Sequence, residues 1–175
     1  GEDIDLELGK LTRVATSSPE RVEAFCQHYD RCGGCKFQHW AEPPYQVWKR
    51  NQLVEALAAQ RITTEIAPLI DAHGAGRRRV SLHVRENDGV WQAGFMEQKS
   101  HALIALDHCP VLVPALQKSA QLAAVFGPSL GPCDVAVTAA DNGLDVSIKA
   151  ERNVVLRRLD ALNEIVRNFG ILRLS

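Results

Sequence analysis

The sequence lacks long hydrophobic runs, a surplus of either charge and a starting methionine. None of its apolar stretches approaches the roughly 18 residues that a membrane-spanning helix needs. Lys and Arg number 20 and Asp and Glu 21, so bulk charge does not drive nucleic-acid binding, and any such contact must come from local patches. The acidic start also lacks the features of a signal peptide, so we expect a cytoplasmic protein that contacts no membrane.

Intrinsic disorder is excluded by composition. Hydrophobic residues make up 46% of the 175-residue chain and charged residues 23%, which is typical of a globular protein. The chain begins at Gly1 and finishes in a strand-like run at 171–175, so we expect it to be an excerpt of a longer protein. Separately, we expect the protein to be monomeric.

Alternating apolar residues predict strands in three parts of the chain. Val80, Leu82 and Val84 alternate with Arg79, Ser81, His83 and Arg85. The turn signal Asn87-Asp88-Gly89 follows, and then strands over 90–96 and 102–106. A second hairpin is predicted over 135–148, with Asp141-Asn142-Gly143 at its turn, and a half-buried strand over 3–8.

Helices are predicted over 43–60, over 113–126 with Gly127-Pro128 ending it, and over 155–169 with Gly170 as its C-terminal cap. Residues 26–42 show little periodicity and predict an irregular cysteine-rich loop. Hairpins interspersed with helices predict an α+β fold, in which helices pack on an antiparallel sheet.

Three of the five cysteines are spaced as C-x5-C-x2-C at Cys26, Cys32 and Cys35. Three thiolates need a fourth ligand, which is either Cys109, followed by proline as in iron–sulfur proteins, or Cys133. An iron–sulfur cluster is favoured over zinc, since structural zinc sites usually pair their ligands in a second short motif. A chain without metal is the remaining alternative, and Cys133 is interpreted as a buried core residue.

The segment from Cys26 to His39, with Cys32-Gly33-Gly34-Cys35 at its centre, resembles the cluster loop of the RNA uracil-5-methyltransferase family. Further similar motifs follow in the family's order: Arg77-Arg78-Arg79-Val80-Ser81-Leu82, Ala93-Gly94-Phe95, Lys99-Ser100-His101 and Asp107-His108-Cys109-Pro110. This resemblance implies a 4Fe–4S cluster with Cys26, Cys32, Cys35 and Cys109 as ligands. It also implies an RNA partner, with ribosomal RNA favoured over transfer RNA.

The resemblance further implies a domain organisation. Residues 1–19 correspond to the last strands of an N-terminal RNA-binding β-barrel, and residues 20–170 to the central iron–sulfur and RNA-binding domain. Helix 43–60 is expected to pack on a catalytic domain outside this chain, and 171–175 to begin the connection to it. No glycine-rich turn for S-adenosylmethionine and no matching nucleophile occur in the sequence, so catalysis and that cofactor are expected only in a full-length protein.

Basic residues on the predicted strands are candidate RNA contacts, because phosphate contacts are made mostly by such side chains. They are Arg77, Arg78, Arg79, Arg85, Lys99 and His101, with Gln38 and His39 beside the cysteines as further candidates. Trp91 and Phe95 either stack on an unpaired base or belong to the core. The alternatives to an RNA-binding cluster domain are a ferredoxin-like redox module and a zinc-binding structural domain.

Overall fold

The computed structural model describes residues 2–7, 10–70, 76–151 and 159–175. They form two compact units, neither of which is a single stretch of chain. Unit 1 comprises residues 1–27 and 35–70, and unit 2 comprises residues 28–34 and 71–175, apart from the positions outside the described ranges.

Unit 1 contains an antiparallel hairpin of β1 (Asp3–Glu7) and β2 (Lys10–Thr16). The alternation in this segment correctly predicted a strand, but the prediction that β1 is half-buried is wrong. All five residues of β1 are exposed, Leu6 to 60%. The physical reason is that this two-stranded ribbon has no covering layer within the described part of unit 1, so its apolar alternation faces solvent.

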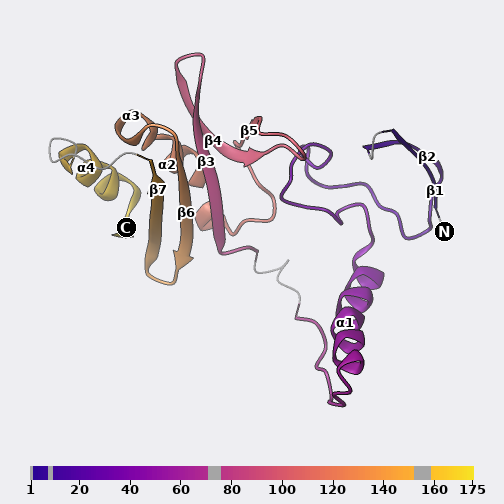
Figure 1. Cartoon of the computed structure of the whole chain (residues 1–175). Helices are drawn as coiled ribbons and strands as arrows, with labels where there is room; N and C mark the ends of the chain where they lie inside the picture. The colour runs from indigo at the N-terminus through magenta and orange to yellow at the C-terminus, as the bar shows by residue number, and fades with distance from the viewer. Residues whose placement is uncertain (1, 8–9, 71–75, 152–158) are drawn as a thin grey trace. The chain divides into compact units, whose positions relative to one another are not determined.

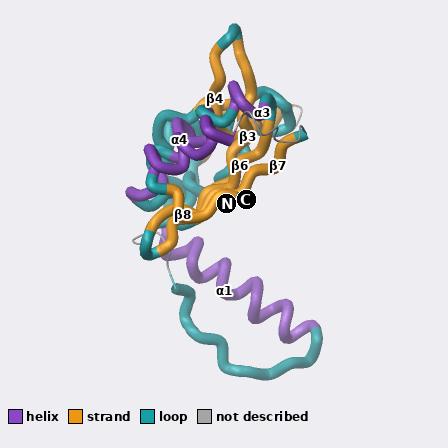
Figure 2. The backbone as a smooth tube through the Cα atoms, turned by 90° about the vertical axis from the view of Figure 1, so that its left-hand side faces the viewer, coloured by secondary structure: helices purple, strands orange, loops and turns teal. Residues whose placement is uncertain are grey.

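The predicted helix at 43–60 is confirmed as α1 (Glu42–Ala59), with Pro43 and Pro44 in the first turn, where proline is tolerated. None of its residues is buried, although Val47, Leu53 and Val54 are apolar. After the helix the chain turns at Arg61, and residues 62–70 run back beside α1 (Figure 2). Arg50 holds this return by donating hydrogen bonds to the backbone carbonyls of Ile66 and Ala67.

Unit 2 is built on a six-stranded sheet with the order β5-β4-β3-β6-β7-β8 (Figure 1). Its strands are β3 (Arg79–Asn87), β4 (Val90–Met96), β5 (Leu103–Ala105), β6 (Cys133–Ala140), β7 (Gly143–Ala150) and β8 (Ile171–Leu174). All pairs are antiparallel except β7 with β8, which is parallel. The α+β class is therefore confirmed, and the sheet is mixed rather than wholly antiparallel.

One face of this sheet carries the core. Val80, Leu82 and Val84 of β3 are at most 4% exposed and oppose Val137, Val135 and Cys133 of β6. Helices α2 (Ser119–Ala124) and α3 (Gly127–Leu130) pack on β3 and β4, and α4 (Leu159–Phe169) packs beside β8 and contributes Leu162 to the same core. The predicted burial of alternate residues in β3 is confirmed.

The single helix predicted over 113–126 is wrong. The chain instead forms a 3₁₀ turn at Pro114–Leu116 and the short helices α2 and α3. Gly127 begins α3 rather than ending a helix, and Pro128 lies in the first turn of α3, where proline is tolerated. The Trp91 ring packs so closely on Gly127 that an added Cβ would lie 2.3 Å away. The helix predicted over 155–169 is described only from Leu159 onward, and Gly170 follows it with φ +63, as a cap glycine does.

None of the helices in the described residues is long and apolar enough to cross a membrane.

Gly94 allows β4 and β5 to pair closely. A Cβ at this position would lie 1.8 Å from the backbone oxygen of Ile104, and backbone atoms have little freedom to move away. We predict that Gly94→Ala lowers the free energy of unfolding by about 1–3 kcal/mol or more, as overpacking does. Gly89→Ala is the control, since its Cβ meets no atom within 4 Å and only its positive φ costs about 1 kcal/mol. Urea unfolding followed by circular dichroism measures both, and equal effects would contradict the close-approach argument.

Candidate metal centre and basic strand

Cys32 is held in unit 2 by a short segment, residues 28–34, that lies along the end of β4. The Gly33 N–H donates to the Met96 carbonyl and the Gln98 N–H donates to the Arg31 carbonyl. The Gln98 side chain donates to the Cys32 carbonyl at 3.1 Å, and Arg31 pairs with Glu97 at 2.9 Å. Backbone and side-chain bonds together thus fix the position of Cys32 on the turn between β4 and β5.

The Cys32 sulfur already accepts a hydrogen bond from the protein. The backbone N–H of Gly34 lies 3.4 Å from Sγ, and an added Cβ at Gly34 would lie 3.4 Å from the same sulfur. Such amide donors stabilise an electron-rich thiolate and are typical of iron–sulfur sites. The glycine pair Gly33-Gly34 thus exposes a backbone amide to sulfur at this bond.

Cys109 lies in a second turn of unit 2 that is clamped by Gln117. The Gln117 amide donates to the carbonyls of Cys109 and Leu112, at 3.0 and 2.8 Å, and its oxygen accepts from the Cys109 N–H at 3.4 Å. Beyond the turn, Leu112 pairs with Arg77, the residue that leads into β3. No local pattern in the sequence predicts this clamp, because Gln117 lies eight positions after Cys109.

The remaining cysteines separate into two kinds. Cys26 and Cys35 are half-buried in unit 1, and the Cys26 N–H donates to Oε1 of Gln38 at 3.1 Å. Cys133 is only 3% exposed and faces the core of unit 2, where burial and then the negative charge of Asp134 raise the pKa of its thiol. The prediction that Cys133 is a core residue is confirmed.

The donor set suits an iron–sulfur cluster in its chemistry. All five cysteines are thiols. Within the described ranges, no group of three or more His, Cys, Asp or Glu side chains is arranged to hold a metal ion. Two observations favour a soft, sulfur-rich ligand nonetheless: the amide bond to Cys32 and a buried, unpartnered nitrogen at Nε2 of Gln38, which is bonded to Cys26 through its Oε1.

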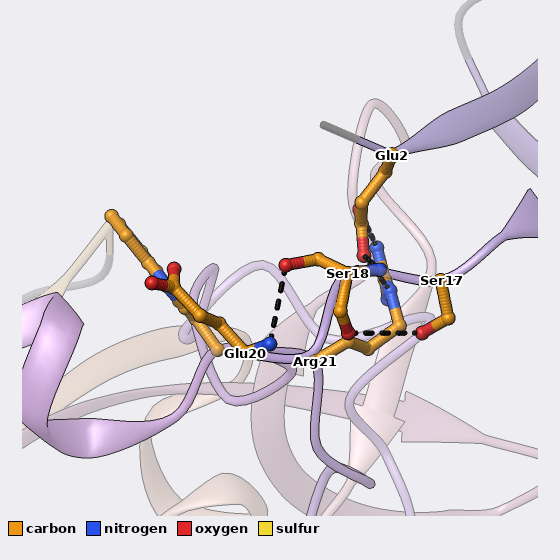
Figure 3. A network of polar contacts seen from close by, with 6 residues as sticks. Glu2, Ser17, Ser18, Glu20 and Arg21 are labelled. Atoms are coloured by element: carbon orange, nitrogen blue, oxygen red, sulfur yellow. Dashed lines mark hydrogen bonds and ion pairs between the residues drawn. The ribbon is translucent and has the colours of Figure 1, made fainter.

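His39 lines a polar pocket of about 240 Å³ in unit 1, together with Glu2, Ser18, Glu20, Arg21 and Trp40. Burial, followed by the positive charge of Arg21, lowers the pKa of His39. Figure 3 shows Arg21 reaching Glu2, to which it donates two hydrogen bonds, and these bonds lower the pKa of Glu2 to about 2. The neutral form of His39 is thereby favoured, which weakens its case as a phosphate contact.

The three consecutive arginines have different surroundings. Arg78 donates to the Ala139 carbonyl and pairs with Asp141 at 2.7 Å, so its charge is already partnered. The exposed guanidinium groups of Arg77 and Arg79 have no ion-pair partner among the residues that the structure describes. Arg77 and Arg79 are therefore better placed than Arg78 to contact phosphate.

Arg79 and Arg85 share the face of the sheet opposite the core. Arg85 is half-buried, donates to the carbonyls of Val84 and Cys133, and lies 3.9 Å from Asp134. His83 lies between them on β3, and its Nδ1 is hydrogen-bonded to Asp134 at 2.7 Å. On β3, the face opposite the core therefore carries both the negative Asp134 neighbour and basic side chains, and Arg79 is the exposed basic residue there.

The other two basic candidates, Lys99 and His101, are exposed around the β4–β5 turn, where Lys99 has a φ of +57.

Of the two alternatives for Trp91 and Phe95, the structure shows the core. Both pack against the buried cluster of unit 2, Trp91 on Gly127 and Phe95 near Gly34. The sequence reasoning missed a different aromatic group in unit 1, formed by Phe37, Trp40, Tyr45 and Trp48 with ring centroids 5.2 to 6.4 Å apart. Its sign in the sequence was the presence of four aromatic residues within the twelve positions 37–48, around the start of α1.

The chain is similar in sequence to several bacterial RNA methyltransferases. It is 33% identical over 175 residues to an uncharacterized RNA methyltransferase of Brucella suis, covering 98% of this chain and 42% of that protein. It is 41% identical over 148 residues to one of Caulobacter vibrioides, covering 80% of this chain and 35% of that protein. This chain is a relative of RNA methyltransferases.

A third relative is the 23S rRNA (uracil(1939)-C(5))-methyltransferase RlmD of Erwinia tasmaniensis, 35% identical over 164 residues, which cover 88% of this chain and 35% of that protein. No family model matches the chain. The chain spans about 40% of the length of the RNA methyltransferases that it resembles. The similarity therefore concerns one part of such a protein.

The hydrogen bonds of Gln117 to the Cys109 turn can be tested by substitution in this chain. We predict that Gln117→Ala lowers the free energy of unfolding by about 1–3 kcal/mol, because it removes three hydrogen bonds to the backbone of this turn. Hydrogen exchange at Cys109 and Leu112 should accelerate together. Gln121→Ala, at an exposed position of α2, is the matched control and should leave both quantities unchanged. Unaltered exchange in Gln117→Ala would contradict the clamp.

Proposed function

We propose that this chain is the cluster-binding and RNA-recognition part of an RNA uracil-5-methyltransferase. The observation that carries the proposal is similarity to RNA methyltransferases along 98% of the chain, one relative being a uracil-C5 enzyme of ribosomal RNA. The cysteine spacing and the exposed arginines before and in β3 support it. Ribosomal RNA is the proposed substrate, S-adenosylmethionine the methyl donor of the whole protein, and the cytoplasm its compartment, where it acts as a monomer.

The proposed ligands of a 4Fe–4S cluster are Cys26, Cys32, Cys35 and Cys109. When bound, such a cluster supplies strong iron–sulfur bonds between segments that are distant in the sequence, so its binding energy becomes folding energy. The chain's own contribution is to hold the sulfurs: the β4–β5 turn holds Cys32, Gln117 holds the Cys109 turn, and Gly34 donates to sulfur. The proposed role is structural rather than electron transfer.

The domain organisation is part of the same proposal. Residues 1–19 are assigned to an RNA-binding barrel, 20–170 to the cluster domain and 171–175 to the connection that follows. Helix α1 is proposed to pack on a catalytic domain, which agrees with an 18-residue helix that buries no side chain within the described residues. Its exposed apolar residues Val47, Leu53 and Val54 suit such a contact.

Iron content tests the cluster. We predict that the chain purified without oxygen is brown and holds about four irons, and that Cys109→Ser loses most of them. Cys133→Ser is the control, because Cys133 faces the core, and it should keep the iron. Stoichiometric zinc without iron would support the zinc-binding alternative. Loss of iron in Cys133→Ser together with retention in Cys109→Ser would refute the assignment of the fourth ligand.

RNA binding tests the basic residues. We predict that the double substitution Arg77→Ala, Arg79→Ala weakens binding of a uridine-containing RNA hairpin roughly tenfold and reduces the salt slope by about 1–2. Arg78→Ala should have a smaller effect, because Arg78 already pairs with Asp141. Arg167→Ala, at an exposed position of α4, is the control for the loss of one surface charge elsewhere and matches Arg78→Ala in charge. RNA affinity is measured by fluorescence anisotropy at several salt concentrations. An unchanged affinity and salt slope in the double variant would exclude the proposed contact.

A further inference from the structure

Gln38 has an unusual environment in unit 1. Its Oε1 accepts a hydrogen bond from the backbone N–H of Cys26 at 3.1 Å. An N–H donor requires an oxygen opposite it, so this bond fixes which way the amide is turned and directs Nε2 elsewhere. Nε2 is buried and has no hydrogen-bond partner among the described residues. It is the one buried side-chain nitrogen or oxygen in that part of the chain with this property.

A buried donor without an acceptor is unfavourable, and in native proteins it commonly marks the place of a group that the polypeptide does not supply. The nearest cysteines in sequence are informative about that group. Gln38 is bonded to the backbone of Cys26 and follows Cys35 by three positions, and both cysteines are half-buried in the same unit. We therefore take sulfur of these cysteines, or of a group bound to them, as the acceptor for the Nε2 donor of Gln38.

An amide hydrogen bond to sulfur is present in the neighbouring segment. The Gly34 N–H donates to Sγ of Cys32 at 3.4 Å, so one backbone amide between Cys32 and Cys35 is directed at sulfur. Hydrogen bonds of this type stabilise the extra negative charge of a reduced cluster and raise its reduction potential. Outer groups that orient a ligand and bond its donor atom together also strengthen metal retention.

We propose that Gln38 is a positioning residue for the cluster: Oε1 holds the backbone of Cys26, and Nε2 donates a hydrogen bond to a sulfur of the cluster that Cys26 and Cys35 help to bind. The proposal rests on the proposed function, because it requires that cluster. It assigns Gln38 a role different from the RNA contact expected from the sequence, since a buried nitrogen is not offered to a ligand in solvent.

Two substitutions separate the two ends of the amide. Gln38→Glu keeps an oxygen for the Cys26 N–H, retains the shape of the side chain and removes the Nε2 donor. Gln38→Leu removes both functions. Gln52→Glu, at an exposed position of α1, introduces the same charge in unit 1 away from the cysteines and serves as the matched control.

The full 175-residue chain and its variants are reconstituted with iron and sulfide without oxygen. Resonance Raman spectra are recorded in water and in deuterium oxide, since an N–H···S bond makes the iron–sulfur stretching frequencies sensitive to deuteration. The midpoint potential and the rate of iron loss to a chelator are measured in parallel. Binding of the same uridine-containing hairpin provides the last measurement.

Gln38→Glu is expected to hold the same amount of iron as the unsubstituted chain, lose part of the deuterium shift, have a lower midpoint potential and release iron about tenfold faster. Gln38→Leu should lose the same deuterium shift, and Gln52→Glu should match the unsubstituted chain. A purely structural role would alter iron release but leave the deuterium shift intact, which would overturn the proposal.

Two other results would overturn it in different ways. Unchanged spectra, potential and release in both Gln38 variants, with weaker RNA binding, would restore Gln38 as an RNA contact while the cluster itself stands. An unsubstituted chain that binds no iron would instead refute the proposed function, and the proposal about Gln38 with it.

Discussion

The apolar pairing of β3 with β6 is the interaction on which unit 2 depends. Val80, Leu82 and Val84 meet Val137, Val135 and Cys133 across the strands, all on one face. Because side chains alternate along a strand, burying these residues also determines that Arg79 and Arg85 lie on the opposite face. The same pairing explains why Cys133 is enclosed and why α2 and α3 have an apolar surface on which to pack.

What the sequence could predict follows from how local each determinant is. The alternation in β3 and β6, the Asn-Gly and Asp-Gly turns and the cap at Gly170 are local, and the structure confirms the strands, hairpins and helix end that they predicted. The packing of the Trp91 ring on Gly127 was missed because Trp91 comes from a strand 36 positions earlier. The exposure of β1 was missed because alternation does not say whether a second layer is present.

The same distinction between local and distant determinants applies to the candidate site. Spacing identified the cysteines, and similarity supported the family context, but the groups that hold Cys32 and Cys109 are Gln98 and Gln117, for which no motif exists. Three adjacent arginines looked equivalent in sequence. Asp141, 63 positions after Arg78, makes one of them different, and only the fold brings the two together.

The interleaving of the two units has a consequence for biosynthesis. Residues 28–34 belong to unit 2, yet their partners at Met96–Gln98 follow after the whole of α1 and its return. A ribosome adds about 5–20 residues each second, so Cys32 leaves the exit tunnel seconds before the turn that holds it exists. The Cys109 turn is completed later still, by Gln117. Nascent chains therefore carry exposed thiols before either turn can form, and the proposed cluster could be loaded only after both turns have emerged.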